Sequence, residues 1–155
     1  MIRVALDSNI LAYLAGVCRT EADEAKIARV REVIAALAER ASLIAPAQAL
    51  GELFVVLRRA GTEAAEVRAI VLEIAETLGT AASEARTISA AADLVVDHRL
   101  QFWDALIVTA AADAGCTLLL SEDMQHGFVV RGMTIVDPLR ATPHAKLAPL
   151  VQPAV

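Results

Sequence analysis

Two short apolar segments of the chain each end in a polar turn that carries a carboxylate. Asp7 directly follows segment 2–6, and Asp123 lies in the turn after segment 116–120. Both segments are predicted to be buried strands because they are short and consist largely of aliphatic residues. The carboxyl ends of parallel strands lie at one edge of a sheet, so both carboxylates are expected there, unless they serve only as turn residues.

Two further acidic residues stand in apolar surroundings. Glu52 lies within a predicted helix, residues 47–60, and no lysine or arginine stands three or four positions from it to form a routine ion pair. A single carboxylate among valine, leucine and phenylalanine is costly to bury unless a charged partner compensates it. Asp104 is the only charged residue between positions 102 and 108. It could cap the helix that follows or belong to a site.

Four carboxylates that converge on one pocket would suit a divalent cation. Like charges so close raise one another's pKa unless a cation holds them, and sites built from oxygen ligands favour Mg²⁺ or Mn²⁺ over Zn²⁺. Such cations support phosphodiester hydrolysis. Asp7 and Asp104 have short side chains at the ends of predicted elements, so they are expected to bind the metal most directly. Glu52 would orient a water molecule, and Asp123 would serve a second ion.

The elements that must position these residues alternate along the chain. The pattern predicts four strands, at residues 2–6, 42–45, 116–120 and 134–136, and a weak further strand at 86–88. It predicts six helices, at residues 10–17, 20–40, 47–60, 63–78, 89–98 and 102–114. This alternation favours a three-layer α/β/α sandwich with a parallel sheet of four or five strands. Residues 1–140 are predicted to form one domain, and residues 141–155 an extended tail.

Composition narrows the class of protein. The 155 residues carry a net charge of −5, although a protein that binds nucleic acid through phosphate attraction alone is normally basic. Excluding four clustered carboxylates leaves −1, so a cation-binding cluster could account for most of the excess. No apolar run is long enough for a membrane span, which favours a soluble cytoplasmic protein. The two cysteines, Cys18 and Cys116, are expected to be buried and reduced.

The motifs around these acids resemble those of PIN-domain ribonucleases, most closely the VapC-type toxins of bacterial toxin–antitoxin pairs. The similar runs begin at Leu6-Asp7-Ser8-Asn9, include Glu52, and continue in Phe102-Trp103-Asp104-Ala105 and Ser121-Glu122-Asp123-Met124. The resemblance extends over residues 2–138. It implies a PIN-like fold and an endoribonuclease dependent on Mg²⁺ or Mn²⁺.

The resemblance also implies residue roles and partners. The acids of the family's site fall on Asp7, Glu52, Asp104 and Asp123, the small hydroxyl residue falls on Ser121, and Ser8 and Asn9 support the first acid. The expected partners are an RNA substrate, a cognate antitoxin and a second copy of the chain in a homodimer. The pair Arg58-Arg59 is typical of a solvated face, although Arg59 could reach an RNA phosphate.

Three other functions remain open from the sequence. A haloacid-dehalogenase-like phosphatase also has an aspartate after its first strand, but it needs a second one two residues later, where this chain has Asn9. A receiver-like signalling domain needs a lysine after a late strand, and neither Lys26 nor Lys146 is in such a place. A non-catalytic PIN-like binding domain would not need all of the acids that this chain keeps.

Overall fold

The central feature of the protein is a six-stranded sheet with the order β3-β2-β1-β4-β6-β5. The computed structural model describes residues 1–152. Five strands are parallel, and the short β5 at one edge runs antiparallel to β6. The strands are β1 (Ile2–Leu6), β2 (Ala41–Pro46), β3 (Gly79–Ala81), β4 (Leu118–Leu120), β5 (Val129–Val130) and β6 (Met133–Val136).

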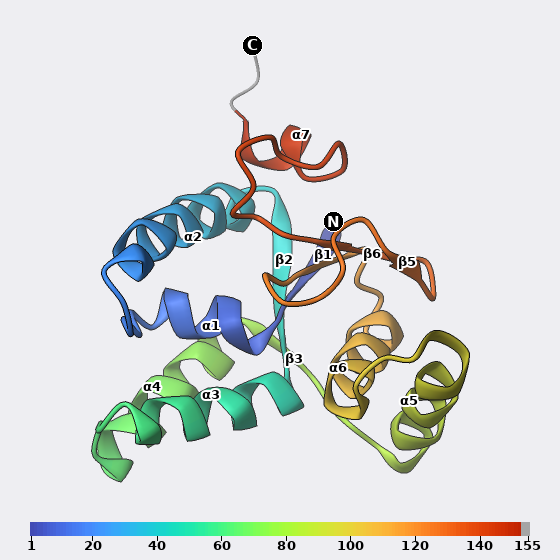
Figure 1. The fold of residues 1–155 in the computed structure, drawn as a ribbon, viewed down its shortest axis with the longest axis horizontal. Helices are drawn as coiled ribbons and strands as arrows, with labels where there is room; N and C mark the ends of the chain where they lie inside the picture. The colour runs from blue at the N-terminus through green and yellow to red at the C-terminus, as the bar shows by residue number, and fades with distance from the viewer. Residues whose placement is uncertain (153–155) are drawn as a thin grey trace.

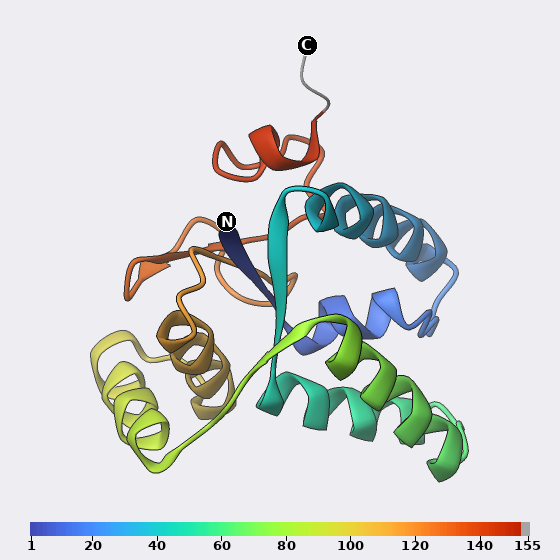
Figure 2. The same ribbon diagram turned by 180° about the vertical axis from the view of Figure 1, so that it is seen from behind.

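Helices cover both faces of this sheet, as Figure 1 and the reverse view in Figure 2 show. The first four helices lie on one side, and α5 and α6 pack together on the other. The helices are α1 (Ser8–Leu14), α2 (Ala22–Ala38), α3 (Ala47–Arg59), α4 (Ala64–Thr77), α5 (Ala85–His98), α6 (Phe102–Asp113) and α7 (Ala148–Val151). The expected three-layer α/β/α architecture is thus confirmed. Five of the strands are parallel, as expected, but the sheet has a sixth, antiparallel edge strand, β5, that was not predicted.

The strand order reverses at β1. The chain proceeds from β1 to β2 and β3 on one side, whereas β4 and β6 lie on the other side of β1. Leu6 pairs with Leu120 at the carboxyl ends of β1 and β4. In open α/β sheets, the crevice beyond this reversal point is the usual position of a functional site. Both strands are buried at these ends, so their positions are fixed by core packing.

One strand prediction is wrong, and a nearby strand was not predicted. Residues 86–88, expected as a weak strand, lie in the first turn of α5, where the Glu84 backbone N–H donates a hydrogen bond to Thr87 Oγ1 at 3.0 Å. The strand in that part of the chain is β3, which begins at Gly79, directly after the predicted helix 63–78. A Cβ atom at this position would lie 2.6 Å from Ile44 Cδ1, so glycine permits the close approach of β3 to β2.

The segment after residue 140 is also different from its prediction. It is not extended throughout, because residues 148–151 form α7, which contacts α2. Leu147 is fully buried and Leu150 nearly so, and Arg40 donates hydrogen bonds to the carbonyl oxygens of Leu150 and Gln152 at 3.0 and 3.2 Å. Residues 153–155 of the predicted tail lie outside the described residues, and the domain boundary at residue 140 stays a prediction.

The two cysteines differ in burial. Cys116 is buried as expected, but Cys18 is exposed, and both thiols are free. Within residues 1–152, no helix combines the length and the apolarity that a membrane crossing requires.

Candidate active site

Asp7 lies at the reversal point of the sheet. Its backbone N–H donates to the carbonyl oxygen of Leu120 at 3.0 Å, which extends the pairing of β1 and β4 by one residue. Asp7 is also the N-cap of α1, and its Oδ1 accepts a hydrogen bond from the backbone N–H of Ser8 at 2.7 Å. The strand end and the helix start therefore fix this carboxylate from both sides.

The Asp7 carboxylate is buried, with 3% of the residue exposed. Its Oδ2 accepts a hydrogen bond from Ser121 Oγ at 2.7 Å, and Ser121 Oγ in turn accepts one from the backbone N–H of Met124 at 3.1 Å. Burial raises the pKa of Asp7 to about 6, although the hydrogen bonds from Ser121 and Ser8 oppose this rise, and the charges of Asp104 and Glu52 add to it. A nearby cation would reverse this penalty on the ionised form.

Asn9 joins the two aspartates that follow strands. Its Nδ2 lies 3.2 Å from Asp7 Oδ2 and 3.2 Å from Asp123 Oδ2, and donates to both. Its Oδ1 accepts a hydrogen bond from the backbone N–H of Glu122 at 3.2 Å. The turn after β4 is thereby attached to α1. Asp123 itself is exposed, and Asn9 is the side chain that bonds it.

Glu52 and Asp104 reach the same edge from helices α3 and α6, which contact each other. Glu52 is half-buried, and its Oε1 accepts a hydrogen bond from Gln48 Nε2 at 3.2 Å, one helical turn earlier. Asp104 is the third residue of α6, whose N-cap is Gln101, so the interpretation of Asp104 as an N-cap is wrong. Burial raises the pKa of Asp104, and the charges of Glu52 and Asp123 raise it further.

The charges of Asp104 and Glu52 act on Asp7, and those of Glu52 and Asp123 act on Asp104. Asp104 thus couples electrostatically to Glu52 and to both aspartates that follow strands. The four carboxylates are not in contact as a preformed ligand set, because among residues 1–152 no three histidine, cysteine or acidic side chains are close enough to hold an ion as they stand. The donor chemistry nevertheless fits a hard divalent cation, since every candidate donor is an oxygen and two of the carboxylates have raised pKa values. Their assignment as metal ligands stays a prediction.

The charge repulsion leads to a prediction for the metal-free protein. We expect Glu52→Gln to keep the fold and to leave the melting temperature unchanged or higher, by about 2–4 °C for each kcal/mol of repulsion removed. Glutamine keeps the carbonyl oxygen that Gln48 bonds while it removes a negative charge near Asp104. Thermal unfolding in EDTA, with Glu66→Gln on the exposed first turn of α4 as control, measures the effect. A large drop specific to Glu52→Gln would show that Glu52 is structural.

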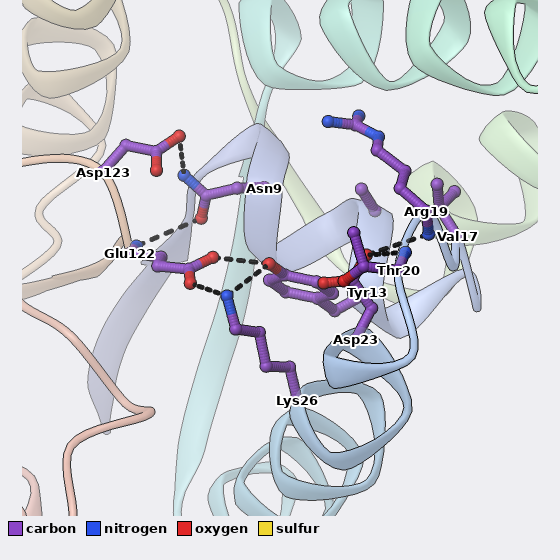
Figure 3. Close-up of a pocket in the computed structure, with 10 residues that line it drawn as sticks. Asn9, Tyr13, Val17, Arg19, Thr20, Asp23, Lys26, Glu122 and Asp123 are labelled. Carbon is purple, nitrogen blue, oxygen red and sulfur yellow. Dashed lines mark hydrogen bonds and ion pairs between the residues drawn. The ribbon is translucent and has the colours of Figure 1, made fainter.

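Sequence reasoning missed a polar network beside the acidic residues (Figure 3). Lys26 of α2 forms an ion pair with Glu122, and the Tyr13 hydroxyl donates to Glu122 Oε2 at 2.6 Å. Burial and this hydrogen bond raise the pKa of Tyr13 to about 12, and Glu122 raises the pKa of Lys26. The network fastens the turn that carries Asp123 to α1 and α2. The signal in the sequence was Glu122 itself, which directly precedes Asp123.

Comparison with known proteins identifies the family of this chain. The family model of the PIN domain matches residues 4–127, and the chain belongs to this family. No curated protein sequence matches the chain.

Two solved structures share the fold at low sequence identity. VapC20 of Mycobacterium tuberculosis, a toxin that cleaves the sarcin-ricin loop, is 19% identical with a TM-score of 0.59, and the match covers 75% of this chain and 86% of that one. VapBC2 from Rickettsia felis, bound to a DNA fragment from its promoter, is 12% identical with a TM-score of 0.62, and the match covers 86% and 97%.

Proposed function

We propose that this protein is a metal-dependent endoribonuclease that acts as the toxin of a toxin–antitoxin pair. The observation that supports this most is the arrangement of the carboxylates in a PIN-domain chain. Asp7 and Asp123 follow the neighbouring strands β1 and β4, while Glu52 and Asp104 approach the same edge on α3 and α6. Such an acidic pocket repels RNA by itself, so a cation is required to bring a phosphate into it.

The proposed roles follow from how each side chain is held. Asp7 and Asp104 would hold Mg²⁺ or Mn²⁺ most directly, because one is fixed by three hydrogen-bond donors and the other by the first turn of α6. A bound cation would supply an activated water and would neutralise charge on the scissile phosphate. Glu52 would orient the attacking water, and Ser121 would hold Asp7 in its orientation. Asp123 would serve a second ion that arrives with RNA.

The substrate and partners are proposed on the same basis. RNA that is single-stranded or in a loop can splay its backbone into a recessed pocket, whereas a duplex cannot do so easily. A cognate antitoxin would block the pocket, and the toxin would form a homodimer. By similarity of fold, VapC20, which cleaves the sarcin-ricin loop, supports an RNA substrate, and VapBC2 supports a cognate antitoxin. Such a toxin would act in the cytoplasm, where its RNA is found.

Asn9 argues against the phosphatase alternative. The residue two positions after the first aspartate would have to exchange protons with the substrate in that chemistry. Here it is an amide whose donors and acceptor are used to join Asp7, Asp123 and the Glu122 backbone. An amide in this position can hold the carboxylates but cannot act as a general acid.

Induced expression in bacteria tests the proposal. We expect the wild-type protein to arrest growth within a few generations and to produce discrete RNA fragments in total RNA. The Asp7→Asn variant should do neither while accumulating to the same level. Growth arrest by both proteins with intact RNA would contradict a nuclease toxin.

A further inference from the structure

Two arginines share a cavity that no acidic side chain lines. This cavity, of about 290 Å³, lies between the end of α3 and the loop after α1, and is lined by Arg19, Val56, Arg59 and Ala60. Neither guanidinium group forms an ion pair or donates a hydrogen bond within the described part of the chain. Two like charges at one cavity repel each other unless an anion lies between them. Their convergence is notable in a chain with a net charge of −5.

The cavity continues toward the acidic residues. An adjoining cavity of about 330 Å³ shares Val56 and Arg59 with the first, and is lined further along by Glu52 and Ser8. We call these two adjoining cavities the arginine groove. Glu52 and Arg59 are seven residues apart on α3, which is about 10 Å along the helix axis. At a rise of about 3.4 Å per nucleotide in a stacked strand, this distance corresponds to at most about three nucleotides.

The loop that carries Arg19 is held in place. Asp23 Oδ2 accepts hydrogen bonds from the backbone N–H groups of Arg19 and Thr20, at 2.9 and 3.1 Å, and Figure 3 shows both. The pKa of Asp23 is lowered, first by the bond from Arg19, so the carboxylate that fixes the loop is ionised at neutral pH. The position from which the Arg19 side chain extends is therefore set before any ligand binds.

We propose that the arginine groove binds the phosphates of single-stranded RNA next to the scissile bond, with Arg19 and Arg59 as the phosphate-binding residues. This inference rests on the proposed nuclease function. Guanidinium groups bind phosphate through paired N–H donors, and among residues 1–152 neither of these two has a protein partner. The exposed side chain of Val55 borders the groove beside Arg59 and offers a base an apolar contact. A strand in this groove would lead directly to Glu52 and to the other carboxylates.

Arg58 provides a matched control within the same helix. It directly precedes Arg59 and is also exposed, but its Nη1 donates to the carbonyl oxygen of Thr62 at 2.9 Å, and it does not line the groove. Arg58→Gln and Arg59→Gln remove the same charge from positions one residue apart. A difference between them therefore reports on the groove and not on net charge.

Steady-state cleavage of a fluorogenic single-stranded RNA in Mg²⁺ tests the proposal. We expect Arg19→Gln and Arg59→Gln each to lower kcat/KM about 5- to 10-fold, mainly through KM, while Arg58→Gln stays within about twofold of the wild type. The slope of log(kcat/KM) against log[salt] should become shallower by about 0.7 for each groove arginine removed. Arg59→Lys, which keeps the charge, should recover part of the loss. The melting temperatures of the Arg19 and Arg59 variants should equal that of the wild type, since both side chains are exposed and neither donates a hydrogen bond within residues 1–152.

The outcomes separate this inference from the proposed function. If the wild type cleaves RNA and the groove variants behave like Arg58→Gln, the inference is wrong and the nuclease function stands. If the wild type cleaves no RNA, the proposed function fails first. Titration of the wild type and of the two arginine variants with inorganic phosphate is the second measurement. Tight phosphate binding that needs both arginines, with unchanged RNA kinetics, would overturn the assignment to RNA and indicate a site for a free anion.

Discussion

Replacing Asp104 or Asp7 with Asn is expected to lower RNA cleavage by about 10³-fold or more, and to abolish tight Mn²⁺ binding. Asp7 is 3% exposed and receives hydrogen bonds from a backbone N–H and two side chains. Because its position is buried and fixed in this way, a neighbouring carboxylate cannot take its place. Asp104 is fixed by the first turn of α6. Asparagine keeps the shape of each side chain but removes the charge that a cation needs.

Asp123→Asn is the matched comparison. Asp123 is exposed, and within the described part of the chain its side chain is held only by Asn9, at 3.2 Å, so it is the least constrained of the aspartates that follow strands. We expect this variant to lose cleavage while it still binds one Mn²⁺ ion. Calorimetric titration of each variant with Mn²⁺ measures how much each of these acids contributes to binding the first ion. Equal loss of binding in Asp104→Asn and Asp123→Asn would show that the ranking is wrong.

Ser121→Ala is expected to weaken metal affinity and activity by about 10- to 100-fold, the usual effect of losing a side chain that orients a ligand. Ser121 is fully buried and is both a donor to Asp7 and the acceptor for the backbone N–H of Met124. Alanine leaves that N–H without its partner, which costs about 1–3 kcal/mol. At this chain length the melting temperature should fall by about 2–4 °C for each kcal/mol. Mn²⁺ titration and thermal unfolding measure the two effects.

Ser8→Ala serves as its control. The Ser8 hydroxyl is 3.5 Å from Asp7 Oδ1, whereas the Ser8 backbone N–H, which alanine keeps, is at 2.7 Å. Its metal affinity should therefore stay within about threefold of the wild type. If both serine variants lose affinity equally, the specific role of Ser121 is wrong.

The parts of the fold that could be predicted are those where local sequence and core packing agree. β1 and β4 are short aliphatic runs that become buried strands, and each is followed by polar residues at the carboxyl edge. The same holds for α3 and α6, where an apolar helix carries a carboxylate with no basic neighbour. Because a parallel sheet brings these strand ends together, the position of the candidate site followed from the order of elements.

The parts that could not be predicted depend on contacts between distant segments. β3 is only three residues long and begins at a glycine, which disfavours a strand. The Ile44 side chain of β2 occupies the space that a side chain at Gly79 would need. Thr87 and Ile88 have β-branched side chains, which favour a strand, but the hydrogen bond from the Glu84 backbone N–H to Thr87 Oγ1 caps the start of a helix instead. Lys26 looked unrelated to any strand end, yet α2 packs beside α1 and brings it to Glu122. No local pattern in a single sequence carries that information.

The most direct test of the account is an RNase assay on the purified protein with Mg²⁺, with Mn²⁺ and with EDTA, beside Asp7→Asn. Within residues 1–152, no basic side chain is bonded to the carboxylates at the end of the sheet, so a cation is needed before an RNA phosphate can approach. Burial raises the pKa of Asp7 to about 6, and a bound cation would favour its ionised form. We predict cleavage of single-stranded RNA with either cation, none above background in EDTA, recovery when Mg²⁺ is restored in excess, and no cleavage by Asp7→Asn under any condition. Cleavage that continues undiminished in EDTA, or that Asp7→Asn retains, would contradict the account.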